Sequence, residues 1–152
     1  MVDLYIKHED EDNHLPIDVE KTLVKKTSFL MEKLGVEKLT IFFCEVETIK
    51  NLNKDFRNQD KPTDILSFNN SSEIDNAGDI DESNFGELAV CLEICKKQAL
   101  EYQLLFIEEL MRLVVHGLVH ITGKDHQNDE DEQVMLAQEI QLLDLIEFKD
   151  LY

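Results

Sequence analysis

Three histidines in the second half of the chain are the residues whose types and spacing best suit catalysis or metal binding. His116 and His120 are four residues apart, and His126 follows six residues later. On a helix this spacing places the first two imidazoles on one face, one turn apart. Gly123 suits a left-handed residue that ends the helix, and the resulting turn could bring His126 to the same point. Three neutral imidazoles favour a borderline-soft divalent metal, Zn²⁺ first, with a fourth position left for water.

The histidine spacing is that of the zinc-protease motif H-E-x-x-H-x-x-G-x-x-H, with Gly117 in place of the general-base glutamate. Glycine inside a helix costs about 1 kcal/mol relative to alanine, so a local requirement must favour it. We infer that the missing side chain leaves room beside the metal for a bulky substrate group. A metalloprotease is the alternative that spacing alone supports, and the missing carboxylate speaks against it. The ordinary alternative is that the histidines are core residues bonded to the backbone.

The composition is that of a globular protein, and we expect a single domain over residues 1–152. Hydrophobic residues make up 43% and charged residues 32% of the chain. The sequence has no apolar run of about 18 residues, so we expect no membrane span, and no signal peptide is visible. Three cysteines, an odd number, argue against a disulfide framework and suggest a reducing, cytoplasmic location.

The formal net charge of −18 argues against a generic nucleic-acid binder, because phosphate contacts need cations. A local cationic edge is nevertheless predicted from four residues in one helix and its following loop: Lys50, Lys54, Arg57 and Lys61.

The elements that must position these residues follow from hydrophobic periodicity. Strands are predicted at Val2–Lys7, Lys38–Cys44, Ile65–Phe68 and Gly86–Cys91. Helices are predicted at Ile17–Leu34 with Gly35 as cap, Thr48–Phe56, Glu93–Leu100, Leu104–Thr122 and from Asp129 onward. Residues 69–84 are polar and acidic, which predicts a mobile loop. Early strands and late helices favour the α+β class: a small mixed β-sheet with helices packed on it, including a metzincin-like metal helix.

Two motifs together resemble the YbeY family of bacterial endoribonucleases, or rRNA maturation factors. The first runs from Asp60-Lys61-Pro62-Thr63-Asp64 through Phe68, and Gly86–Cys91 follows it in the family order. The second runs from His116 through His126, and Met135 and Glu139 also stand at family positions. The resemblance covers most of residues 47–140.

The resemblance implies a zinc-dependent, single-strand-specific endoribonuclease that acts in ribosomal RNA processing, notably at the 3′ end of the small-subunit RNA, and in ribosome quality control. It implies that His116, His120 and His126 are the zinc ligands and that Arg57 is functionally important. Lys124 stands where the family usually has an aromatic residue. The partner is then ribosomal RNA, in the context of the ribosome or its precursors.

Several supporting roles stay open at this stage. Arg112 either faces the site or pairs with Glu108 on the helix surface. Asp125 either orients a ligand imidazole or forms a turn. Cys91 and Cys95 are predicted to be core residues, although either would close a structural metal site in a non-catalytic ribosome-associated factor. The sequence does not predict the oligomeric state.

Overall fold

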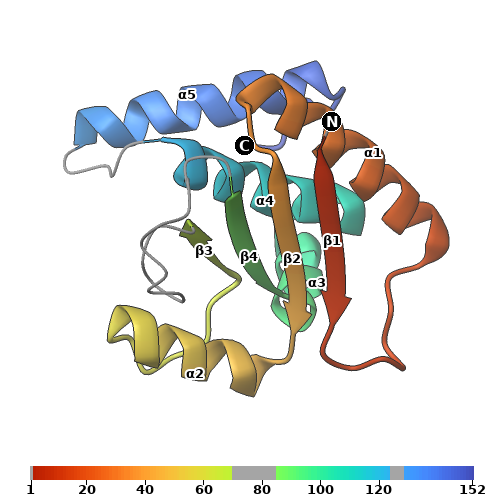
Figure 1. Cartoon of the computed structure of the whole chain (residues 1–152), viewed down its shortest axis with the longest axis vertical. Helices are drawn as coiled ribbons and strands as arrows, with labels where there is room; N and C mark the ends of the chain where they lie inside the picture. The colour runs from red at the N-terminus through yellow and green to blue at the C-terminus, as the bar shows by residue number, and fades with distance from the viewer. Residues whose placement is uncertain (1, 70–84, 124–128) are drawn as a thin grey trace.

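A computed structural model of the chain describes residues 2–69, 85–123 and 129–152 (Figure 1). Its strands are β1 (Asp3–His8), β2 (Lys38–Cys44), β3 (Ile65–Asn69) and β4 (Phe85–Cys91). Its helices are α1 (Ile17–Leu34), α2 (Val46–Arg57), α3 (Leu92–Tyr102), α4 (Phe106–Thr122) and α5 (Asp129–Leu145). None of the helices in the described ranges is both long and apolar enough to cross a bilayer.

The four strands form one mixed sheet in the order β1-β2-β4-β3. β1, β2 and β4 are parallel neighbours, and β3 runs antiparallel to β4 at the edge. β3 is thus separated from β2 by β4, although only α2 and a loop lie between β2 and β3 in sequence. The predicted α+β class and small mixed sheet are confirmed.

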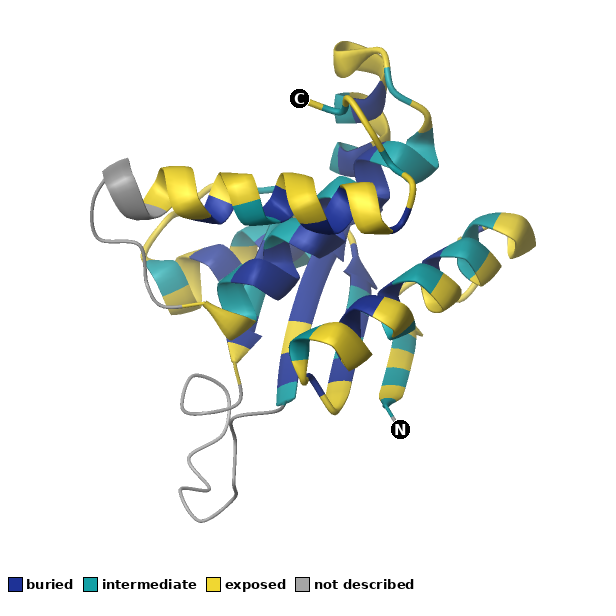
Figure 2. Ribbon diagram, turned by 90° about the horizontal axis from the view of Figure 1, so that it is seen from above, coloured by how far each residue is buried: buried dark blue, intermediate teal, exposed yellow. Residues whose placement is uncertain are grey.

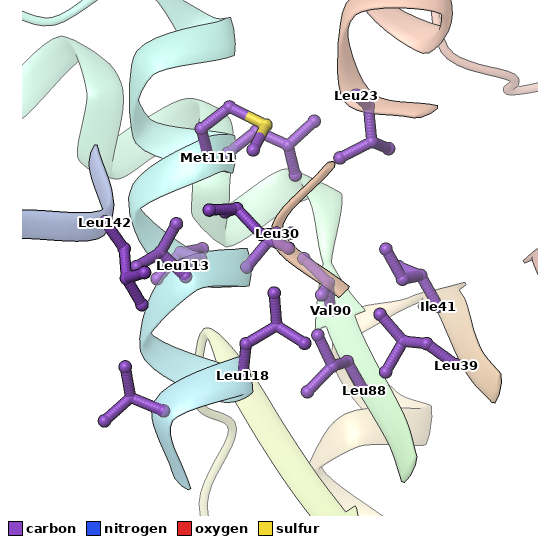
Figure 3. Close-up of a cluster of buried hydrophobic side chains, with 14 of the residues drawn as sticks. Leu23, Leu30, Leu39, Ile41, Leu88, Val90, Met111, Leu113, Leu118 and Leu142 are labelled. Carbon is purple, nitrogen blue, oxygen red and sulfur yellow. The ribbon is translucent and has the colours of Figure 1, made fainter. Parts of the chain in front are cut away.

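The largest core lies between one face of this sheet and the helices α1, α4 and α5, with Cys95 from α3 (Figure 3). α4 is the most buried helix: nine of its side chains or glycines are buried, from Glu109 to Val119. Figure 3 shows Leu118 of α4 opposite Leu88 of β4, with Ile41 of β2 beyond. Because α4 is packed on several sides, its position relative to the sheet is firmly set.

The opposite face of the sheet carries a smaller core with α2. Leu66 and Phe68 of β3 pack there with Ala89 of β4 and Ile49 of α2. α2 lies at one end of the sheet, away from α5 (Figure 1). The outward side of α1 is exposed to solvent (Figure 2). In α2, all residues except the buried Ile49 and Asn53 are exposed or half-buried, as expected for an amphipathic helix. Cys91 and Cys95 are both fully buried, so their predicted place in the core is confirmed.

Two predictions about helix ends have different outcomes. Gly35 caps α1 in the left-handed region with φ 74°, as predicted. Gly123 after α4 is instead extended, with φ −90° and ψ 171°, so the prediction of a left-handed residue was wrong. Glycine is required there for a different reason, because a Cβ atom would lie 2.7 Å from the carbonyl oxygen of Val119.

Candidate active site

His116 and His120 lie side by side on the exposed edge of α4. Their ring centroids are 4.4 Å apart and their planes are inclined by 63°. The side chain of His116 is 43% exposed although the helix around it is buried. The prediction that both imidazoles share one helical face is therefore confirmed, and the alternative of two core histidines is wrong.

The two histidines line an open groove of about 730 Å³, a size typical of ligand sites. One wall is α4, with His116, Gly117, His120 and Ile121. The other is formed by the end of α2, the following loop and β3, and it includes Phe56, Arg57, Asn58, Thr63, Asp64 and Asn69. The groove thus brings together Arg57 and two of the three predicted metal ligands.

His126, Lys124 and Asp125 lie outside the described residues, as do residues 70–84 of the loop predicted at 69–84. Asn69, the first residue of that predicted loop, is the last residue of β3. Within the described ranges, no group of three His, Cys, Asp or Glu side chains is arranged to hold a metal ion. The predicted third ligand, His126, is not among these residues. Neither Cys91 nor Cys95 is among the described residues that line the groove.

Glu139 of α5 contacts His116, and this contact is one that the sequence analysis missed. Its Oε2 lies 2.9 Å from Nδ1 of His116, and its side chain is 5% exposed. Its other oxygen, Oε1, accepts a 2.6 Å hydrogen bond from the hydroxyl of Tyr152. Burial opposes ionisation of this carboxyl group, but the hydrogen bonds from His116 and Tyr152 outweigh it and lower the pKa of Glu139. The only available signal was the match of Glu139 to its family position.

An ionised carboxylate is only an acceptor, so Nδ1 of His116 must carry the proton in this contact. In the neutral ring the lone pair then lies on Nε2. Carboxylates that bond the second nitrogen in this way fix the tautomer and orientation of metal-binding histidines. The structure therefore prepares His116 to act as a ligand through Nε2.

Arg57 is held in place by groups from two elements. Its Nη1 donates to the Phe56 carbonyl at 3.1 Å, and its Nη2 donates to the Ser67 carbonyl of β3 at 2.8 Å. Its guanidinium carbon lies 5.0 Å from the centre of the Phe68 ring. Arg57 was predicted to lie in a loop, but it belongs to the last turn of α2, and Asn58 caps that helix at φ 58°. It is a half-buried, packed arginine and not a freely solvated one.

The loop between α2 and β3 is held by two buried or half-buried polar side chains. Asn53 of α2 donates from Nδ2 to the Lys61 carbonyl at 2.9 Å. Asp64 accepts from the Ile65 backbone N–H at 2.7 Å through Oδ1, and from Gln98 at 3.2 Å through Oδ2. Asp64 thus bonds the backbone at the start of β3 and also links this strand to α3. These contacts fix the wall that carries Arg57.

Arg112 does not pair with Glu108, so that prediction was wrong. It forms a two-point ion pair with Glu109, from Nε at 2.7 Å and from Nη2 at 2.9 Å. Glu108 instead accepts from the Leu105 backbone N–H at the start of α4. Glu109 is fully buried and also accepts from Gln98 at 2.7 Å. Arg112 also borders a hollow with His116, His120 and Glu139, which agrees with the other alternative, that it faces the site.

Gly117 is required by packing against the sheet. A Cβ atom at this position would lie 2.5 Å from Cδ2 of Leu88 and 3.1 Å from Cδ1 of Ile65. The space that a side chain would enter is filled by the protein itself. The inference that Gly117 leaves room for a substrate group was therefore wrong.

The chain is similar to proteins of one family along most of its length. A family model described as Endoribonuclease YbeY matches residues 5–147. Endoribonuclease YbeY of Treponema denticola is 40% identical over 108 residues, which cover 69% of this chain and 68% of that protein. The protein of the same name from Bacillus velezensis is 32% identical over 142 residues, with coverages of 89% and 90%.

A solved structure has a similar fold. The solution structure of TM1509 from Thermotoga maritima superposes with a TM-score of 0.63 at 26% sequence identity. The match covers 94% of this chain and 88% of that one.

Proposed function

The chain belongs to the YbeY endoribonuclease family, and from this premise we propose that it is a metal-dependent endoribonuclease that cleaves single-stranded RNA. The observation that carries the proposal is one groove lined by Arg57, His116 and His120. We further propose ribosomal RNA as the substrate, with a role in 3′-end maturation of the small-subunit RNA and in ribosome quality control.

We propose that zinc is the metal and that His116, His120 and His126 hold it. The donor chemistry of the described pair fits zinc, because both are imidazoles on one helical face and His116 is oriented by Glu139. When bound, zinc supplies Lewis-acid polarisation of a phosphate oxygen and lowers the pKa of water at the site. Neutral histidine ligands leave the full charge of the cation available for this purpose.

Arg57 is proposed to bind the phosphate at the cleavage site. Its guanidinium carries a permanent positive charge, and planar N–H donors suit phosphate oxygens. The Ser67 carbonyl and the Phe68 ring already hold the group in place before substrate arrives. Because little side-chain entropy is lost on binding, a group held in this way can stabilise the charge that develops in the transition state.

The acidity of the whole chain does not prevent a local approach of RNA to α2. Lys50 and Lys54 lie on α2, and Lys61 follows in its loop, on the same segment as Arg57. At about 0.15 M salt, interactions between exposed charges are screened beyond about 8 Å. Arg57, which lines the groove, therefore affects a bound strand more than distant carboxylates do.

The two alternative functions have no specific observation in their favour. A protease of this ligand spacing needs a carboxylate beside the metal, and the corresponding position is the packed Gly117. The described carboxylate in the groove, Asp64, is engaged with Ile65 and Gln98. A purely structural metal site is usually closed by a fourth protein ligand, and the described histidines border an open groove.

The test is cleavage of a labelled single-stranded RNA by the purified chain, beside the same sequence as a duplex. We expect cleavage of the single strand, loss of cleavage with a chelator, and recovery on adding Zn²⁺. Arg57→Ala and His116→Ala should each abolish it, whereas Lys25→Ala, on the far helix α1, should not. Cleavage that survives both the chelator and Arg57→Ala would refute the proposal.

A further inference from the structure

Behind His116, a series of polar contacts leads away from the groove to the end of the chain. His116 contacts Glu139, and Glu139 accepts from Tyr152. The ring of Tyr152 lies over Arg112, with 5.5 Å from the guanidinium carbon to the ring centre. The end of the chain thus lies beside α4 and α5 (Figure 1).

Arg112 is itself fixed and provides a firm support for the tyrosine ring. Glu109 binds it through both oxygens in a fully buried position. A second tyrosine, Tyr102 of α3, lies over the same guanidinium at 5.4 Å. Arg112 is therefore enclosed by two aromatic rings and one carboxylate, and its position sets the position of both rings.

We infer that Tyr152 is a positioning residue for the metal site: its hydroxyl, located by Arg112, holds Glu139 in the orientation that presents Nε2 of His116 to the groove. This inference rests on the proposed function. It goes beyond the ligands and Arg57. Tyr152 is not among the described residues that line the groove with Arg57; it borders a second, smaller hollow with His116 and His120, and its hydroxyl donates to Glu139.

The physical argument is that a carboxylate can rotate about its terminal bond unless both oxygens are held. One oxygen of Glu139 faces His116 and the other faces Tyr152, at 2.9 Å and 2.6 Å. Burial and the hydrogen bond to Glu139 raise the pKa of Tyr152, so its hydroxyl keeps the proton that it donates. Without the hydroxyl, the carboxylate is free to rotate and the His116 ring is less well defined.

The chain offers a matched pair of substitutions. Tyr152→Phe keeps the ring over Arg112 and removes the hydroxyl, which donates to Glu139 and also interacts with Arg112. Tyr102→Phe removes a hydroxyl from the other ring over the same guanidinium, and that ring has no described contact with Glu139. Both side chains are about half exposed, at 53% for Tyr102 and 55% for Tyr152, so neither change disturbs the core.

The first measurement is the tautomer of His116 in the metal-free chain of residues 1–152, by long-range proton–nitrogen NMR correlation with labelled histidine. Wild type and Tyr102→Phe should show the proton on Nδ1. Tyr152→Phe should show a shift toward a mixture of the two tautomers. An unchanged tautomer in Tyr152→Phe would overturn the inference.

The second measurement is the affinity for Zn²⁺ by competition with a chelator. We expect a loss of about tenfold to 100-fold for Glu139→Gln and of about threefold to tenfold for Tyr152→Phe, with Tyr102→Phe unchanged. Because Tyr152 acts through Glu139, Tyr152→Phe should cause no further loss in the Glu139→Gln background. An equal loss in both backgrounds would overturn the inference.

The two proposals fail in different ways. If wild type binds no Zn²⁺, the metal site of the proposed function is wrong, and the NMR measurement still tests the contact between Tyr152 and Glu139. If wild type binds Zn²⁺ and Tyr152→Phe binds it equally well, the inference alone is wrong.

Discussion

Replacing Gly117 with alanine should destabilise the protein, although alanine is the better helix former. The new Cβ atom would lie 2.5 Å from Cδ2 and 3.2 Å from Cδ1 of Leu88, well inside ordinary van der Waals contact. Leu88 is fully buried and cannot move away freely. Overpacking of this kind costs about 1–3 kcal/mol, and the gain in helix propensity offsets about 1 kcal/mol. The net loss of unfolding free energy is then about 0–2 kcal/mol.

A second substitution separates the two contributions. Leu88→Val removes both Cδ atoms that collide with the new methyl group and by itself costs about 1–2 kcal/mol. In that background, Gly117→Ala should be neutral or stabilising by up to about 1 kcal/mol, because the 2.5 Å contact is gone and only the 3.1 Å contact with Cδ1 of Ile65 still opposes the gain in helix propensity. The double variant should therefore be about 1–3 kcal/mol more stable than the sum of the two single effects predicts.

The assay is equilibrium unfolding in denaturant for wild type, both single variants and the double variant. All four curves are fitted with one common dependence of the unfolding free energy on denaturant concentration. If Gly117→Ala alone unfolds at higher denaturant than wild type, the space beside Gly117 is open. That result would refute the packing argument and restore the interpretation that this glycine makes room for substrate.

Three further predictions concern the groove wall, the buried thiols and the response to acid. Arg57→Lys keeps the charge but loses the planar group that donates to the Ser67 carbonyl. The kcat for cleavage of single-stranded RNA should fall at least about tenfold, with the free energy of unfolding unchanged. Full activity of this variant would contradict the assigned role. Burial raises the pKa of Cys44 to about 12, so its thiol should react with a thiol-specific reagent at pH 8 far more slowly in the folded than in the denatured chain, as followed by mass spectrometry. Burial and the charge of His14 lower the pKa of His8 below its ordinary 6.5. The unfolded chain therefore binds this proton more readily as pH falls through 6.5, stability decreases, and His8→Phe should show a smaller decrease in a pH series of unfolding curves.

Local features of the sequence predicted much of the fold. Helix α1 and strand β2 have their predicted bounds, because an apolar stripe and a β-branched, aromatic run are distinct periodic signals. The shared face of His116 and His120 follows from helix geometry alone. Whether Arg57 lies near His116 and His120 could be determined only from the structure, because Arg57 is far from both histidines in the sequence.

The features that sequence analysis missed depend on neighbours far away in the chain. Glu139 approaches His116 from another helix, 23 positions along the chain, and no pattern within α5 indicates that contact. The role of Gly117 depends on Leu88 in the adjacent strand, and spacing within the motif cannot show what fills the space beside it. For Arg112, both Glu108 and Glu109 have helical spacings that suit an ion pair, and burial on the inner face of α4 selects Glu109.

The order of strands also determines when the groove can exist. One wall of the groove carries Arg57 and the other carries His116, roughly 60 residues later in the sequence. In the sheet, β3 lies next to β4 and not next to β2. During translation the Arg57 wall is made first, and β3 has no ladder partner until β4 has left the ribosome. The opposing wall follows later still, with α4. A groove of this kind cannot assemble until the residues from α2 through α4 have all been synthesised, so any cleavage that depends on it begins late in translation.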